Sequence, residues 1–283
     1  MEAETLVNLP PELERVIFEL AAWQEPGIIK SLILVAKRVR VWIEPELYRV
    51  VLCYGHDGGQ RLLQMMESKP SEFLQKHVHH LALSASVERS DVTRILSTCT
   101  KVHDLALWTG KTDTELLSDL RNLTNLRHLS VNLFELFGGD RNFQLPRLDE
   151  LPFAHLTHLD VFSAMPMTLW PFFSMLPRLT HLSLSDTYIP RLIQTALDTC
   201  TVLQLLVVVW NESPGDAVPF TSTISDPRFC VVWCEAYEED WEEGAHGGSD
   251  FWHRAEIARQ KRRERRRKGS ESEEMEVYAP DLS

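Results

Sequence analysis

Apolar residues recur at regular intervals along the middle of the chain. A six-residue pattern with apolar residues at its first, fourth and sixth positions occurs six times. The copies are VHHLAL from Val78, VHDLAL from Val102, LRHLSV from Leu126, LTHLDV from Leu156, LTHLSL from Leu179 and LQLLVV from Leu203. Their starts lie 24, 24, 30, 23 and 24 residues apart, and a weaker seventh copy begins at Phe229. The alternation within each copy predicts a short β-strand with one buried face.

The segments between these copies carry a different pattern. Apolar residues there are spaced three and four positions apart, as in Val92-Ile95-Leu96 and Leu192-Ile193-Ala196-Leu197, which predicts helices. Each unit is therefore expected to be a strand followed by a helix on the opposite side. A single unit cannot bury its own apolar face, so neighbouring units must share one core. The 30-residue interval is rich in turn residues and predicts a loop insertion.

This spacing and the L-x-x-L-x-L pattern resemble leucine-rich repeats. We therefore expect an α/β fold in which about six to seven strand–helix units form a solenoid. The third, fifth and seventh positions of each copy should face away from the core, on the concave surface. The residues expected to bind a target protein there are His128, His158, His181, Asp160, Trp108, Phe162 and Trp210.

Two kinds of side chain stand out on this expected binding surface. Aromatic residues dominate interface energies, so we expect Trp108, Phe162 and Trp210 to anchor the target. Histidines occupy the third position of several copies, among them His128, His158 and His181. A flat row of histidines with no cysteine or glutamate gives no enclosed metal site, so we expect a polar contact surface and no metal or other cofactor.

A different pattern occupies the first fifty residues. Pro10 and Pro11 suit the start of a helix, and an apolar stripe follows with the spacing of one helix face. The stripe consists of Leu13, Val16, Ile17 and Leu20. After Pro26 and Gly27 a second helix is expected, with further apolar residues beyond one face. Such a surplus suggests a binding partner, although the helices could instead cap the end of the repeats.

Composition and charge narrow the classes of function. The chain has 283 residues, is 44% hydrophobic and carries a net charge of −12, which is typical of a globular protein and unfavourable for general binding to nucleic acid or anionic membranes. No apolar run is long enough to cross a membrane. Five scattered cysteines and an acidic N-terminus without a secretory pattern indicate reduced thiols in the cytoplasm and/or nucleus.

The C-terminal segment combines acidic and basic runs. Six of the nine residues 235–243 are acidic, and eight of the ten residues 259–268 are basic. The basic run is expected to lie on a helix, where it is either solvated or paired within the molecule, acts as a nuclear-localisation signal, or contacts nucleic acid. The final residues are expected to be disordered. The expected divisions are 1–50 for the helical domain, 51–77 for a connecting helix or linker, 78–236 for the repeats and 237–283 for the tail.

The motif LPPEL, with Ile17 and the later run SLILVAKRV, resembles an F-box. The whole chain is similar to fungal proteins that join an F-box-like domain to leucine-rich repeats. This resemblance implies docking on the Skp-family adaptor of a cullin ubiquitin ligase, while the repeats present a target protein. The contact residues that it implies are Leu9, Pro10, Leu13, Ile17, Leu32 and Val35. Some of these residues must instead pack in the core of the helical domain. The sequence does not show which of them contact the adaptor and which belong to the core.

Catalytic motifs are not found in the sequence. It contains no G-x-S-x-G, no glycine-rich phosphate loop, no H-E-x-x-H and no clustered cysteine–histidine set. The expected function is therefore that of a non-catalytic substrate receptor in a Skp–cullin–F-box ubiquitin ligase. The alternative is a protein-interaction scaffold without a role in ubiquitin transfer. Weaker still is a role as a nucleic-acid tether through residues 259–268.

Overall fold

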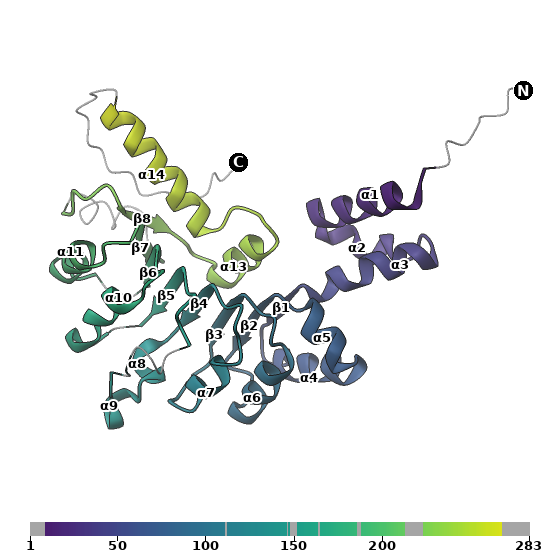
Figure 1. Ribbon diagram of the computed structural model, residues 1–283, viewed down its shortest axis with the longest axis horizontal. Coiled ribbons are helices and arrows are strands. Elements are labelled where there is room, and N and C mark those ends of the chain that lie inside the picture. Colours follow the sequence, from purple (N-terminus) through teal and green to yellow (C-terminus); the bar gives the residue numbers. More distant parts are fainter. Residues whose placement is uncertain are drawn as a thin grey trace, which may run out of the picture.

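Eight parallel strands, arranged in the order of the chain, form one continuous sheet (Figure 1). The computed structural model describes residues 9–110, 112–145, 147, 152–163, 165–185, 188–212 and 223–267. The strands are β1 (Val50–Cys53), β2 (His80–Ser84), β3 (Asp104–Trp108), β4 (His128–Val131), β5 (His158–Phe162), β6 (His181–Ser185), β7 (Leu205–Trp210) and β8 (Phe229–Trp233).

From β2 to β7 the pairing follows the sequence intervals residue by residue, whereas β8 is shifted by three residues, so that Phe229 pairs with Leu206 rather than Leu203. His80 pairs with Asp104, His128 pairs with His158, and His181 pairs with Leu205. The same position of each copy therefore forms a row across the sheet. Since side chains alternate between the two faces of a strand, the leucines after these positions all lie on one face. That row is Leu81, Leu105, Leu129, Leu159, Leu182 and Leu206, and every member is buried.

A layer of short helices covers the leucine face of the sheet (Figure 1). It consists of α4 (Gly58–Ser68), α5 (Ser71–His77), α6 (Arg89–Thr98), α7 (Leu116–Leu120), α8 (Leu133–Leu136), α9 (Gly139–Asn142), η4 (Met167–Leu169), α10 (Pro171–Met175) and α11 (Pro190–Thr199). One apolar core extends between these helices and the sheet from Cys53 to Val231. Burial of this core is the main force that holds the two layers together.

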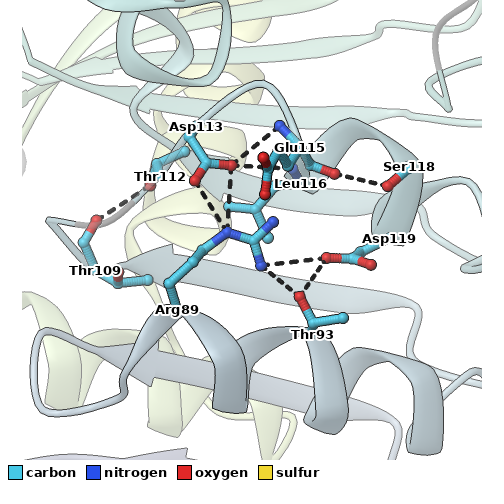
Figure 2. A network of polar contacts seen from close by, with 9 residues as sticks. All are labelled: Arg89, Thr93, Thr109, Thr112, Asp113, Glu115, Leu116, Ser118 and Asp119. Atoms are coloured by element: carbon cyan, nitrogen blue, oxygen red, sulfur yellow. Dashed lines mark hydrogen bonds and ion pairs between the residues drawn. The ribbon is translucent and has the colours of Figure 1, made fainter.

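Polar contacts join neighbouring helices of this layer at its surface. Figure 2 shows the Arg89 side chain of α6 between two aspartates of the following unit. Its Nε donates to both carboxylate oxygens of Asp113, at 3.2 and 3.1 Å, and its Nη1 lies 3.3 Å from Asp119. Asp113 also accepts from the backbone N–H groups of Glu115 and Leu116 at the start of α7. A single arginine thus fixes α7 against α6.

Two C-terminal helices cover the opposite face of the sheet (Figure 1). They are α13 (Tyr237–Ala245) and α14 (Phe251–Arg267). Trp241 and Ala245 of α13 pack on Ala82 and Ala106 in the first strands. Phe251 and Ala255 of α14 pack on the apolar second faces of β7 and β8. The sheet is therefore buried on both sides over much of its area.

The N-terminal helices form a separate small unit beside β1. They are α1 (Pro11–Gln24), η1 (Pro26–Ile28), α2 (Ile29–Leu32), α3 (Lys37–Ile43) and η2 (Glu44–Tyr48). Its core contains Ala22, Ile29, Val39 and Ile43. Pro11 at the first helical position and the acidic Glu12 and Glu14 in the first turn favour the start of α1. Among the described residues, no helix is long and apolar enough to cross a membrane.

The expected fold, an F-box followed by a leucine-rich-repeat solenoid, is wrong. The structure shows one eight-stranded, all-parallel sheet with helices on both faces, rather than stacked repeat coils with an open concave surface. The sheet also begins earlier, because 51–77 contains most of β1 together with α4 and α5. The L-x-x-L-x-L pattern indicates only that one face of a strand is buried. Strands of an α/β sheet also have a buried face, so the pattern does not distinguish the two folds.

Candidate protein-interaction surfaces

An exposed apolar stripe runs along α1. It consists of Leu13, Val16, Ile17 and Leu20, whose exposed fractions lie between 52% and 56%. Positions i, i+3, i+4 and i+7 share one face of a helix, so these four side chains form a continuous surface. The core of the N-terminal unit uses other residues of α1, chiefly Ala22 and Phe18. The α1 stripe is therefore available to a partner.

The structure divides the six adaptor-contact residues that the sequence predicts. Leu9, Leu13, Ile17 and Val35 are exposed large apolar residues, and Pro10 is also exposed. Leu32 instead packs partly buried against the core of the N-terminal unit. The exposed Leu34, next to Val35, adds apolar surface that the sequence analysis did not include.

An arginine–carboxylate pair fixes α3 against α1 beside the stripe. Arg38 donates from Nε and Nη2 to the two oxygens of Glu14, at 2.8 and 2.7 Å. The hydrogen bond from Arg38 lowers the pKa of Glu14 and raises the pKa of Arg38 in turn. Two parallel hydrogen bonds constrain direction as well as distance, so the two helices are held in one orientation.

The predicted histidine row exists, and α14 covers it. The rings of His128 and His158 are 4.0 Å apart between centroids, and those of His158 and His181 are also 4.0 Å apart. Trp252 of α14 lies edge-on to His158 and His181, at 5.3 and 5.8 Å. The Nε2 of His181 donates to Glu256 at 2.8 Å, because a carboxylate can only accept.

The environment of this row keeps the imidazoles neutral. Burial lowers the pKa of His128, His158 and His181, although Glu256 partly opposes this effect at His181. The rings of His158 and His181 are stacked, and those of His128 and His158 are tilted by 33°. Among the described residues, no group of three or more His, Cys, Asp or Glu side chains could hold a metal ion.

Two further residues expected to bind a target, Asp160 and Trp210, lie on different faces of the sheet. Asp160 is buried on the covered face, where it accepts hydrogen bonds from Ser130 at 2.6 Å and from the Tyr237 hydroxyl. Burial raises its pKa. Trp210 packs against the main core under the helix layer, because it alternates with Val209, which faces α14. Asp160 therefore shares the covered face with His128 and His158, whereas Trp210 lies on the opposite face.

Trp108 and Phe162, in contrast, lie together at the wall of one cavity. Its volume is about 250 Å³, and it lies at the carboxyl ends of the strands, beside the start of α13. The lining residues are Trp108, Phe162, Ser185, Val209, Asn211, Cys234, Glu235, Tyr237 and Glu238. Crevices at the carboxyl ends of parallel strands are common binding sites in α/β proteins.

No family model matches this chain, and no curated protein matches it. The resemblance to F-box and leucine-rich-repeat proteins therefore stays a prediction. Function has to be argued from the surfaces of this chain.

Sequence reasoning expected Phe251 and Trp252 to dock on the end of the repeats, but it missed that the second face of the sheet is covered. Trp241, Phe251 and Ala255 contribute to this cover, and they come from the segment that we expected to be a tail. One signal was present in the strands themselves. LLVVVW and FCVVW are apolar at every position, which is typical of strands buried on both faces.

Part of the basic run makes contacts within the molecule. Arg259 pairs with Glu256 at 2.7 Å, and Arg262 donates to the carbonyl oxygen of Phe229. These contacts agree with intramolecular pairing, one of the alternatives for the basic run. Residue 268 and the final residues lie outside the described part of the chain. Within the acidic run, Asp240 pairs with Arg254.

The five cysteines are buried and free. Burial raises the pKa of Cys99, Cys230 and Cys234 to about 12, so these thiols stay protonated and unreactive. They act as small apolar residues of the core.

Proposed function

We propose that this chain is a substrate-recognition adaptor of a Skp–cullin–F-box ubiquitin ligase. In this proposal the α1 stripe docks on the Skp-family adaptor, and the sheet-bearing part holds a target protein. The observation that supports it best is the exposure of Leu13, Val16, Ile17 and Leu20 on a unit that has its own core. Contiguous exposed apolar surface of this kind marks interaction sites.

The exposed stripe favours docking over a role as an end cap. A capping helix would bury its apolar face on the first strand, whereas more than half of each stripe side chain is exposed. Near its end, α1 contacts the rest of the molecule through Trp23. The Arg49 guanidinium lies over this ring, 4.4 Å from its centroid. The stripe itself takes no part in this contact.

The proposed mechanism is positional. An adaptor that binds the ligase with one surface and the target with another raises the effective concentration of the target near the loaded conjugating enzyme. No bond is made or broken by this chain in such a role, and ubiquitin transfer belongs to the other subunits.

Co-purification with the Skp-family adaptor of the host tests this proposal. The wild type should retain the adaptor, and the double variant Leu13→Asp, Ile17→Asp should lose it, because two charges would enter an apolar interface. Both residues are exposed, so circular dichroism should show an unchanged fold. The matched control is Ile189→Asp, Val202→Asp, which places the same charges at exposed apolar sites near β6 and β7.

The control variant should bind the adaptor as the wild type does. Failure of the wild type to bind would overturn the ubiquitin proposal, and a scaffold function would remain. Equal binding by the wild type and the Leu13→Asp, Ile17→Asp variant would show that the α1 stripe is not the docking surface.

A further inference from the structure

The cavity beside the start of α13 has three aromatic walls. Trp108 ends β3, Phe162 ends β5, and Tyr237 begins α13, so the chain brings them together from positions far apart in sequence. Aromatic ring faces carry negative electrostatic potential. A cavity with such walls favours either an apolar group or a cation, and the other lining residues decide between the two.

The positions of two of these rings are fixed by their neighbours. The Nε1 of Trp108 donates to Ser130 at 3.0 Å, and its ring lies edge-on to Tyr237 and Trp241, at 5.6 and 5.8 Å. The Tyr237 hydroxyl donates to the buried Asp160, and its ring stacks on Phe251. The walls are therefore formed before any ligand arrives, which lowers the entropic cost of binding.

Charge distinguishes a cationic ligand from an apolar one. Glu235 and Glu238 line the cavity, and its described lining contains no lysine, arginine or histidine. In the described part of the chain, neither glutamate forms an ion pair. An apolar ligand would remove water from these carboxylates without replacing its hydrogen bonds, whereas a cation would pair with them. The cavity therefore brings three aromatic side chains and two carboxylates together within one small volume.

We infer that this cavity binds the cationic side chain of a lysine or arginine presented by a partner protein. Its volume of about 250 Å³ is below the range typical of cofactor sites, so it fits a single long side chain. The net charge of −12 attracts a basic partner over longer distances. This inference deepens the proposed function, because it names the class of target. It rests on the proposed function in one respect only, namely that the lysine or arginine belongs to a target protein.

Fluorine NMR of the full-length chain can test the inference at the site itself. The protein would be labelled with 5-fluorotryptophan, and the Trp108 signal would be assigned by its loss in Trp108→Phe. The probes are the N-acetyl methylamides of lysine, arginine and norleucine, the last being a chain of similar length without the ammonium group. The lysine or arginine compound should shift the Trp108 signal saturably, and the norleucine compound should not.

The lysine and arginine compounds separate the two possible sources of the cation. Binding by either one supports the inference, and the stronger ligand identifies the preferred side chain. Binding of the norleucine compound with equal affinity would overturn it, because the site would then be merely apolar. Absence of binding by all the compounds would overturn it as well.

Two variants test the proposed contacts, with a matched control on α13. Glu235→Gln, Glu238→Gln should weaken binding by up to about fivefold for each charge removed. Glu239→Gln, Glu242→Gln changes the net charge equally at exposed positions outside the cavity and should have a much smaller effect. Phe162→Leu keeps an apolar wall, removes the ring face and should weaken binding about two- to fivefold. Equal effects of the two glutamine pairs would contradict the assignment.

The outcome is independent of the Skp-adaptor test. The Leu13→Asp, Ile17→Asp variant changes no residue of the cavity, so it should bind the cationic compound as the wild type does. If the wild type binds the compound but not the adaptor, the cationic site is supported and the ubiquitin proposal fails. If it binds the adaptor but not the compound, the ubiquitin proposal is supported and the cationic site fails.

Discussion

The Arg254 guanidinium lies 2.5 Å from the Asp240 carboxylate and joins α14 to α13 above the sheet. Both side chains are nearly buried, with 11% and 9% exposed. Asp240 also accepts from the backbone N–H of Phe251 at 2.7 Å, and Arg254 donates to the carbonyl oxygens of Ser249 and Trp233. This pair therefore fixes the turn between the two helices that cover the second face.

Arg254→Met should destabilise this cover. Removal of one partner leaves a buried charge unpaired, which typically costs about 3–5 kcal/mol. Hydrogen exchange should show loss of protection in α13 and α14 first, and urea unfolding should give the total loss. The double variant Asp240→Leu, Arg254→Met leaves no unpaired charge and should recover much of this stability. Wild-type protection in the single variant would contradict the role assigned to the pair.

Acidification should destabilise the protein through His103. Burial lowers the pKa of His103 to about 4, and His79, His80, Asp104 and His128 are the charged or titratable groups that act on it. Between pH 6.5 and about 4 the unfolded chain binds a proton at this site that the folded chain does not, so stability falls as the pH falls. Thermal unfolding should show the wild type losing stability relative to His103→Asn over this range.

A second group opposes this pH dependence and serves as its control. Burial raises the pKa of Asp250 to about 6, so the folded chain binds a proton there before the unfolded chain does. Relative to Asp250→Asn, the wild type should therefore gain stability as the pH falls below 6. As the pH falls, the stability of the wild type should therefore decrease relative to His103→Asn and increase relative to Asp250→Asn. A His103→Asn difference that stays constant with pH would contradict the assignment for His103.

Arg89→Met should destabilise the helix layer through the contacts in Figure 2. The variant keeps the apolar stem and removes the hydrogen bonds to Asp113 and Asp119. Because Asp113 is partly exposed, we expect a loss of about 1–2 kcal/mol in the free energy of unfolding by urea. The control is Arg15→Met, which removes an exposed pair with Glu19 and should cost no more than about 0.5 kcal/mol. Equal losses would show that the Arg89 network is merely a surface contact.

From β2 to β7, strand positions and pairing register could be predicted from the sequence, because both depend on local alternation. The interval of 30 residues between the third and fourth copies appears directly as the pairing of His128 with His158. The histidine row follows from the same register. These features needed no knowledge of how distant segments pack.

The architecture and much of the expected site could not be predicted in this way. Whether the face with His158 is open depends on Trp252, which comes from a segment almost a hundred residues later, and no local pattern encodes that contact. β1 was missed because VVLC is too short to show an alternating pattern. The exposure of Leu13 and the burial of Leu32 depend on how three short helices pack, since both occupy apolar positions in the sequence.

The order of the strands has a consequence for synthesis of the protein. Each strand pairs only with strands adjacent in the chain, so the sheet and its helix layer can assemble while the ribosome is still translating. The helices that cover the second face follow all eight strands in the chain. Until they have been synthesised, the growing chain exposes the apolar strands around Val207 and Val232 to solvent. The growing chain is therefore more prone to aggregation after β8 has formed and before α14 covers it.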